Sequence, residues 1–196
     1  MATILLLARA FREHGGDQVA RFEQAGHDVL VSPAPGAMSG EELLAYLRAD
    51  GVGARVNAIV AGGEQLTSDV LDELPALRII ARWGIGYDMV DLGAASKRGV
   101  FVTNTPGLLS ESVADLAFGM IMALSRKLHV ADRQVRAGNW REVYGVYTWR
   151  KSLGIFGFGG IGQALARRAR GFDMPVTACD PYADADAARG LGVRLV

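Results

Sequence analysis

The sequence predicts an α/β protein with parallel sheets, and two observations carry this prediction. Short, continuous apolar runs alternate with stretches of helical spacing along the first hundred residues. Strands that are apolar throughout are typical of a parallel sheet covered by helices on both faces. A further strand–helix–strand unit begins at Leu153. We therefore expect two α/β domains, residues 1–104 and 105–196, both built on parallel strands.

The elements of the first domain follow from these runs and from their boundary residues. The expected strands are Ile4–Ala8, Asp28–Ser32, Ala58–Ala61, Arg78–Ala81 and Val100–Thr103. Helical spacing predicts helices at Asp17–Ala25, Glu41–Leu47 and Thr67–Leu74. Thr67 or Ser68 is the expected cap of the last one, and Pro75 follows its end. Proline and glycine make Asn104–Gly107 the expected hinge between the domains.

A long helix is expected to begin after the hinge, with Ser110 as its cap. Its residues from Val113 to Leu124 are apolar nearly all round. Such a helix should be buried on most sides, between domains or against another subunit, although an ordinary core helix fits the pattern equally well. A more polar helix ending near Gly138 and a connecting loop, YGVYTWRKS, lead to Leu153.

Composition narrows the function classes. The 21 basic and 21 acidic side chains cancel, which gives no indication of a nucleic-acid or anionic-membrane partner. The single cysteine, Cys179, can form no internal disulfide, and no metal-ligand cluster gathers around it. The apolar run at Ile4–Ala8 lacks the basic start and cleavage site of a signal peptide, and Leu116–Leu124 is far too short to span a bilayer. We expect a soluble, cytoplasmic protein.

One short stretch, GIFGFGGIG, contains glycines at 157, 159 and 162 in the spacing of a dinucleotide-binding turn. In a chain with 25 glycines this spacing alone is weak. Its context is stronger, because a strand at Leu153–Phe156 precedes it and a helix at Ile161–Arg170 follows. A second strand, Val176–Cys179, then ends on Asp180, close to the ~20-residue spacing of a ribose-binding carboxylate.

Each of these positions has a physical role in such a site. Gly157 makes the tight turn, Gly159 lets the backbone approach the pyrophosphate, and Gly162 lets the helix close on the strand. The amides at the helix N-terminus face the phosphates. Asp180, with no nearby arginine for a 2′-phosphate, favours NAD over NADP, although it could also be a turn residue before Pro181.

Several longer motifs resemble the D-isomer-specific 2-hydroxyacid dehydrogenases, with phosphoglycerate dehydrogenases as the most similar branch. The motifs are RWGIGYDMVDLGAASKRGVFVTNTPG, SVADLAFGMIMALSR, AGNW and LGIFGFGGIGQALARRARGFDMPVTACDPY, and the resemblance runs from about Ala58 to Tyr182. It implies a flavodoxin-like N-terminal substrate domain followed by a Rossmann NAD-binding domain. It also implies hydride transfer between NAD and small D-2-hydroxy or 2-oxo acids, and a homodimer formed through the 110–140 helical region.

The resemblance also implies roles for particular residues. Ile85 and Gly86 lie where the family's loop faces the substrate carboxylate and the nicotinamide, and Gly160 and Ile161 lie where it contacts the pyrophosphate. Without the resemblance, Gly84–Gly86 would be a plain tight turn. Arg82 could be a clamp for the carboxylate, although a solvated arginine at a strand end is the commoner case. The family usually has arginine at position 160 and asparagine at position 89. Gly160 therefore removes one phosphate contact, and Met89 replaces the asparagine.

The family's catalytic arginine, carboxylate and histidine would lie beyond Val196, and none of His14, His27 and His129 matches a catalytic position. We therefore expect a truncated Rossmann domain with an open edge at Val193–Val196, part of a longer enzyme or a defective remnant, and no dehydrogenase activity in the chain alone. One alternative is a non-catalytic NAD-binding or dimerisation module of the same fold. An unrelated hydrolase that uses bound NAD is disfavoured by the NTPG…SVAD spacing.

Overall fold

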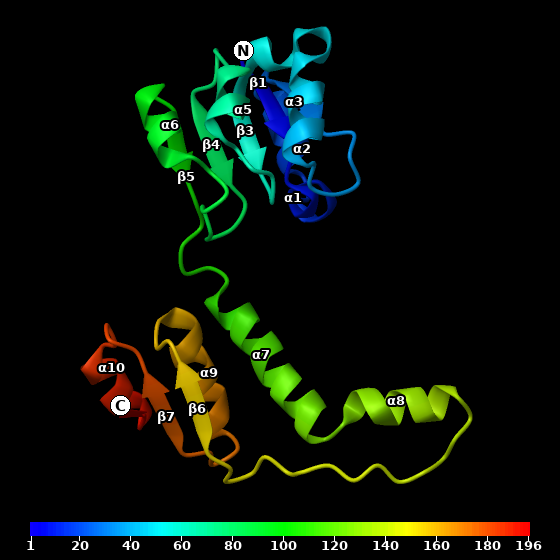
Figure 1. Ribbon diagram of the computed structural model, residues 1–196, viewed down its shortest axis with the longest axis vertical. Coiled ribbons are helices and arrows are strands. Elements are labelled where there is room, and N and C mark those ends of the chain that lie inside the picture. The colour runs from blue at the N-terminus through cyan, green and yellow to red at the C-terminus, as the bar shows by residue number, and fades with distance from the viewer. The chain divides into compact units, whose positions relative to one another are not determined.

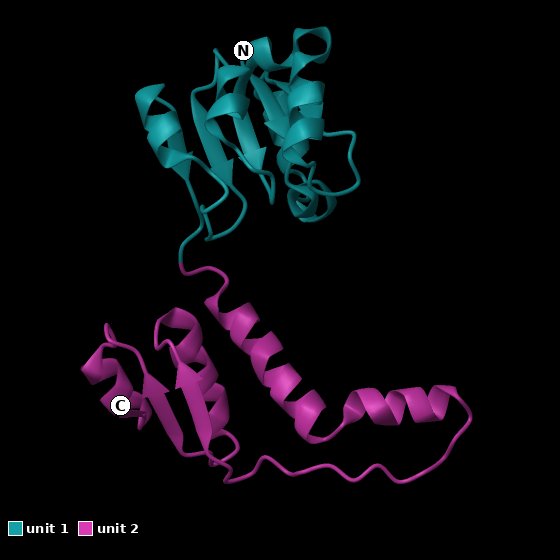
Figure 2. Ribbon diagram, in the orientation of Figure 1, with its two compact units in different colours: residues 1–106 teal, residues 107–196 magenta.

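Two separate parallel sheets organise the protein in this computed structural model, which describes all of residues 1–196. A five-stranded sheet with the order β2-β1-β3-β4-β5 lies in unit 1, residues 1–106, and a three-stranded sheet with the order β6-β7-β8 lies in unit 2, residues 107–196 (Figure 2). Every paired strand runs parallel to its neighbour. The predicted α/β class with parallel sheets is confirmed.

Unit 1 alternates strands with helices along the chain (Figure 1). Its strands are β1 (Thr3–Leu6), β2 (Asp28–Val31), β3 (Val56–Ala61), β4 (Ile79–Arg82) and β5 (Phe101–Thr103). Its helices are α1 (Arg9–His14), α2 (Gln18–Gln24), α3 (Gly40–Arg48), α4 (Val52–Arg55), α5 (Ser68–Asp72) and α6 (Leu92–Lys97), with a 3-10 turn η1 (Ala49–Gly51). The strand order is that of flavodoxin-like sheets, and the order reverses between β1 and β3.

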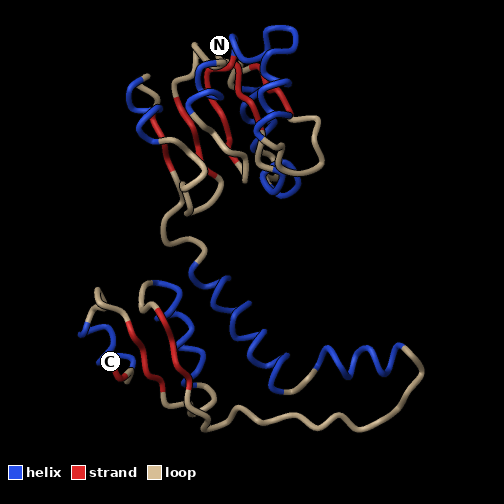
Figure 3. The backbone as a smooth tube through the Cα atoms, viewed as in Figure 1, coloured by secondary structure: helices blue, strands red, loops and turns tan.

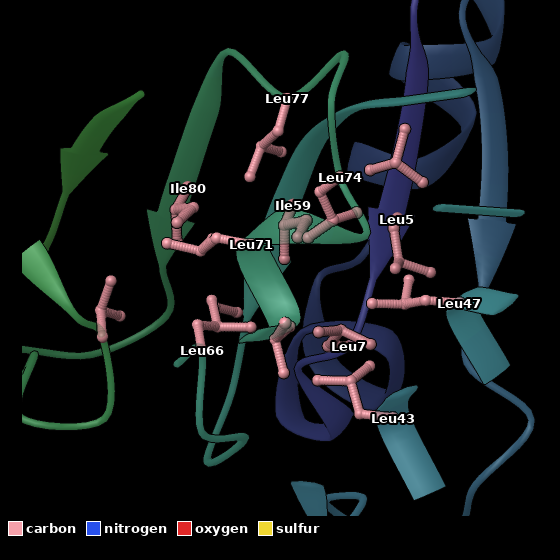
Figure 4. Close-up of a cluster of buried hydrophobic side chains, with 14 of the residues drawn as sticks. Leu5, Leu7, Leu43, Leu47, Ile59, Leu66, Leu71, Leu74, Leu77 and Ile80 are labelled. Carbon is pink, nitrogen blue, oxygen red and sulfur yellow. The ribbon is translucent and has the colours of Figure 1, made fainter. Parts of the chain in front are cut away.

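Helices cover both faces of this sheet, as the continuous apolar strands predict. Alternate residues of β1 and its following loop point to opposite faces, so Leu5 and Leu7 belong to one core and Ile4 and Leu6 to the other. The larger core packs β1, β3 and β4 against α3, α4, α5 and α6 (Figure 4). The smaller one joins the opposite face to α1 and α2 through Phe11 and its partly buried neighbours.

Local capping chemistry defines several helix starts in unit 1. Ser39 and Glu42 form a reciprocal capping box at α3, and Asp91 accepts a hydrogen bond from Ala94 N at the start of α6. Thr67 occupies the cap position of α5, but its side chain makes no capping hydrogen bond. The sequence pattern did not predict α1, α4 or α6, which are only four to six residues long.

Unit 2 begins with two helices and ends in a strand–helix–strand–helix–strand series. Its elements are α7 (Ser110–Ser125), α8 (Leu128–Arg136), β6 (Leu153–Phe156), α9 (Gly160–Arg170), β7 (Val176–Cys179), α10 (Ala185–Leu191) and β8 (Arg194–Leu195). Residues 137–152 between α8 and β6 form no helix or strand (Figure 3). Residues of α9 and α10 share one buried cluster with residues of β6 and β7, so the two helices cover the same face of the sheet. Ile155 and Ala178 point into that face, whereas Phe156 is exposed.

The structure corrects one expectation about the long helix α7 and excludes one of the two interpretations of its apolar surface. Its cap position is Leu109, and Ser110 is the first helical residue and makes no capping hydrogen bond, so the predicted Ser110 cap is wrong. Within this chain only Ala114 and Phe118 are buried, so α7 is not an ordinary core helix, and its burial between domains or against another subunit stays a prediction. Phe118 packs against Phe172 after α9, with 4.9 Å between ring centroids. The opposite face exposes apolar side chains at Val113, Leu116, Met120 and Leu124.

Ion pairs tie the polar edge of α7 to α9. Arg168 Nε donates to Asp115 Oδ1 at 2.7 Å, and its Nη1 donates to Glu111 Oε2 at 2.8 Å. Arg167 also pairs with Glu111. Hydrogen bonds from Arg168 and Arg167 hold the pKa of the Glu111 carboxyl below its ordinary value of 4.5. The same contacts, first with Glu111 and then with Asp115, raise the pKa of Arg168.

This network predicts acid sensitivity of unit 2. Because the pKa of Glu111 is lower in the folded chain, its stabilising contribution is present above pH 4.5 and is lost as the pH falls through the folded value. We expect Glu111→Gln to lower the thermal midpoint slightly at pH 7 and to reduce its fall between pH 4.5 and 3. Glu23→Gln, at an exposed carboxylate on α2, is the control. Identical pH profiles of Glu111→Gln and wild type would contradict the role given to this network.

Candidate dinucleotide site and the Gly84–Gly86 turn

The glycine loop lies between β6 and α9, at the carboxyl end of the first strand of unit 2. Gly157 has φ of +89°, a conformation that glycine adopts without strain. A Cβ at Gly162 would lie 2.2 Å from Gly157 O, so only glycine allows α9 to start this close to β6. A Cβ at Gly159 would meet no atom within 4 Å, so this part of the loop is open to an approaching group. The three glycines therefore occupy three different environments.

Asp180 lies beside the same loop. Phe158 N donates to its Oδ2 at 2.6 Å, and Tyr182 N donates to its Oδ1 at 2.8 Å. These amides, Phe158 first, hold the pKa of the carboxyl below its ordinary value, so the group is an anion at neutral pH. The contact with Tyr182 is the turn expected before Pro181, and the contact with Phe158 joins the end of β7 to the glycine loop. The turn-residue interpretation therefore describes part of the geometry of Asp180, and its role as the ribose acceptor stays a prediction.

The N-terminus of α9 presents free donors at the loop. The amides of Gly160, Ile161 and Gly162 make no hydrogen bond within the chain, as is usual for a first helical turn. They begin a helix of eleven residues, whose dipole adds a partial positive charge at this end. An anionic group seated on the open side of Gly159 would meet these amides, and a pyrophosphate fits this arrangement.

Position 160 has a neighbour that the sequence did not indicate. A Cβ at Gly160 would lie 2.7 Å from Ser110 Oγ, the hydroxyl at the start of α7. A side chain at position 160 therefore requires Ser110 to turn away. Because Gly160 has no side chain, the Ser110 hydroxyl can pack directly over it.

In unit 1 the Gly84–Gly86 turn follows β4, and a neighbouring segment holds it in place. Asn104 Nδ2 donates to Ile85 O at 2.9 Å, and Thr105 N donates to Gly84 O at 3.0 Å. The amides of Ile85 and Gly86 make no hydrogen bond within the chain. Two adjacent amide donors without partners are suited to an anion such as a carboxylate. Asn104 was expected only as part of a hinge, and its hydrogen bond to the turn could not be deduced from one sequence.

The residues beside this turn have mainly structural contacts. Arg82 Nη1 donates to Ala61 O and Trp83 O, both at 3.1 Å, so the guanidinium is partly buried against the backbone rather than solvated. Met89 is exposed, and its carbonyl accepts a hydrogen bond from Leu66 N at 2.7 Å. At Met89, where the family usually has asparagine, a backbone hydrogen bond thus holds the loop.

Each of the three histidines belongs to a segment other than these two loops. His14 is at the exposed end of α1, His27 is half-buried in the turn before β2, and His129 is in α8. None of them contacts the glycine loop or the Gly84–Gly86 turn through a hydrogen bond.

No helix in the chain combines the length and the apolar character needed to cross a bilayer.

Comparison with known proteins places these features in a family. The profile of the "D-isomer specific 2-hydroxyacid dehydrogenase, catalytic domain" family matches residues 9–190. A glyoxylate reductase from Thermococcus kodakarensis is 35% identical over 201 residues, covering 97% of this chain and 57% of its own length. A D-3-phosphoglycerate dehydrogenase from Methanocaldococcus jannaschii is 34% identical over 182 residues, covering 92% of this chain and 33% of its own length.

Solved structures agree with these relatives. The apo-structure of D-lactate dehydrogenase from Escherichia coli superposes with a TM-score of 0.80 at 28% identity, covering all of this chain and 60% of that one. The chain spans about half the length of several of the curated relatives that it matches, for example 42% of a glyoxylate reductase from Korarchaeum cryptofilum. With a family match along nearly its whole length, the chain belongs to the D-isomer specific 2-hydroxyacid dehydrogenase family.

Proposed function

We propose that this chain is the substrate-binding and dinucleotide-binding part of an NAD-dependent dehydrogenase of small D-2-hydroxy acids. The observation that carries the proposal is the loop at Gly157–Gly162, in which closely packed glycines, free helix amides and the Asp180 carboxylate meet. In this proposal, residues 1–104 form the substrate domain and residues 105–196 the NAD-binding domain.

The chain's own groups have distinct tasks in this proposal. The amides of Gly160, Ile161 and Gly162 bind the pyrophosphate, and Asp180 accepts the ribose hydroxyls. NAD, when bound, supplies the hydride acceptor. The amides of Ile85 and Gly86 hold the substrate carboxylate, which orients the C2 atom. Fixed backbone donors suit this task because they need no reorganisation when the anion binds.

A homodimer formed through the 110–140 region is part of the proposal. The exposed apolar side chains Val113, Leu116, Met120 and Leu124 share α7, and a soluble monomer rarely leaves such a set uncovered. Sedimentation of the chain should give twice the monomer mass of 20.9 kDa, and a monomer at high concentration would contradict this part. A cytoplasmic location stays a prediction of the composition, as does the absence of a nucleic-acid or membrane partner.

Calorimetry with two cofactors tests the proposal. We expect NADH to bind the 196-residue chain and NADPH to bind at least tenfold more weakly, because the 2′-phosphate would approach the Asp180 carboxylate. Equal affinity for the two cofactors, or no binding of either, would contradict the proposed site.

We further propose that the chain alone oxidises no NADH with hydroxypyruvate, and detectable turnover by the pure protein would disprove this.

Position 160 offers a gain-of-function prediction. Gly160→Arg should tighten NADH binding several-fold by adding a guanidinium–phosphate contact. Because Ser110 Oγ lies 2.7 Å from the new Cβ, the gain should be larger in the double variant Ser110→Ala, Gly160→Arg. Ser110→Ala alone is the control and should leave the affinity unchanged. A double variant that binds no better than wild type would show that this position does not face the phosphates.

A further inference from the structure

A small cavity lies at the carboxyl edge of the five-stranded sheet, where the strand order reverses. Its volume is about 250 Å³, and the segments that follow β1, β3 and β4 line it. Ligands of open α/β sheets bind outside the carboxyl ends of the strands at this kind of reversal. Trp83 is one of the lining residues and directly precedes the Gly84–Gly86 turn. The cavity is therefore beside the amides proposed to hold the substrate carboxylate.

A buried carboxylate forms part of the cavity wall. Glu64 is only 2% exposed, and its one hydrogen bond comes from Gly62 N to Oε2 at 2.9 Å. No lysine, arginine or histidine forms an ion pair with it. A carboxylate held in this way leaves its second oxygen as an acceptor for a ligand. It also disfavours any further negative charge nearby, because burial weakens solvent screening.

The cations that line the cavity do not offset the negative charge of Glu64. Arg9 is already paired with Glu13, with 2.7 Å between Nε and Oε1. Arg82 is the remaining cation, and one of its nitrogens donates to backbone carbonyls. Position 62 cannot supply another, because a Cβ at Gly62 would lie 2.9 Å from Ala8 Cα. Arg82 is therefore the one lining cation without a carboxylate partner, it faces the charge of Glu64, and no cation is left to balance an anionic group placed in the cavity.

We propose that Glu64 makes this cavity select 2-hydroxy and 2-oxo acids with an uncharged substituent and reject those that carry a phosphate. This inference rests on the proposed function, since it concerns the substrate of the same site. It favours small acids of the glyoxylate or glycerate kind over 3-phosphoglycerate. A hydroxyl on the substituent could donate to the free oxygen of Glu64.

Amide NMR of the ¹⁵N-labelled 196-residue chain tests the inference with a matched pair of ligands. D-glycerate and D-3-phosphoglycerate differ only by the phosphate. We expect D-glycerate to shift the amides of Gly62, Gly63 and Trp83, and to bind about tenfold or more tightly than the phosphorylated acid. Glu64→Gln, which keeps the size and the acceptor, should reduce this ratio several-fold, whereas Glu23→Gln should preserve it. If wild type bound D-3-phosphoglycerate as tightly as D-glycerate, or more tightly, the inference would be overturned whatever the variants show.

Inorganic phosphate separates this inference from the proposed function. If neither acid shifts any amide of unit 1, the proposed substrate site fails, and phosphate still tests the cavity by itself. Phosphate should leave Gly62, Gly63 and Trp83 unshifted in wild type and should shift them in Glu64→Gln. Phosphate binding to the wild-type cavity, or no difference between the two proteins, would show that Glu64 does not set the charge preference.

Discussion

Gly162→Ala is expected to destabilise unit 2 by about 3 kcal/mol and to abolish NADH binding. The added Cβ would lie 2.2 Å from Gly157 O, and both atoms belong to the contact between β6 and α9. Neither can turn away as a flexible side chain would, so the helix must move from the strand, which places this change at the upper end of overpacking costs. Denaturant unfolding and NADH titration measure the two effects.

Gly159→Ala is the matched control in the same loop. Its φ of −72° suits alanine, and its Cβ would meet no atom within 4 Å. We expect its free energy of unfolding to stay within about 0.5 kcal/mol of wild type. NADH binding should nevertheless weaken, because the methyl group would occupy the open side where the pyrophosphate approaches. Equal destabilisation by the two alanines would contradict the separate roles given to these glycines.

Asp180→Ala is expected to weaken NADH binding at least tenfold and to remove the preference for NADH over NADPH. The change takes away the acceptor proposed for the ribose hydroxyls, and hydrogen bonds to charged groups are among the stronger ones. It also frees Phe158 N, which donates to Asp180 at 2.6 Å, so the glycine loop loses one of its anchors. Both effects act in the same direction on binding.

Asp184→Ala separates a binding effect from a general loss of stability. Asp184 caps α10 in the same unit by accepting hydrogen bonds from Asp186 N and Ala187 N. Its replacement should cost about 1 kcal/mol of stability and leave NADH affinity unchanged. If Asp180→Ala bound NADH and NADPH as wild type does, Asp180 would be a turn residue and not the ribose acceptor.

The sequence predicted the parallel strands and the glycine loop well because their signals are local. A four-residue strand, three glycines and a helix lie within Leu153–Arg170, so backbone sterics alone determine which positions need glycine. The unpartnered amides of Ile85 and Gly86 likewise follow from a short Gly-x-Gly turn. These features depend on few contacts with distant parts of the chain.

The remaining features depend on contacts between segments that are far apart in the sequence. The apolar pattern of α7 indicated a covered surface but not what covers it, and in this chain one face stays exposed. Ser110 approaches Gly160 only because α7 packs on α9. Glu64 resembles any loop carboxylate until β1 and β3 are placed side by side. The short helices α1 and α6 offer too few residues for a clear helical period.

Backbone amide shifts of the ¹⁵N-labelled 196-residue chain during an NADH titration test the central claim most directly. The account predicts saturable shifts centred on Gly157–Gly162 and on the Asp180–Tyr182 turn, and their loss in Gly162→Ala. Shifts confined to other parts of the chain, or an unchanged glycine loop at millimolar NADH, would contradict the assignment of this loop as the dinucleotide site.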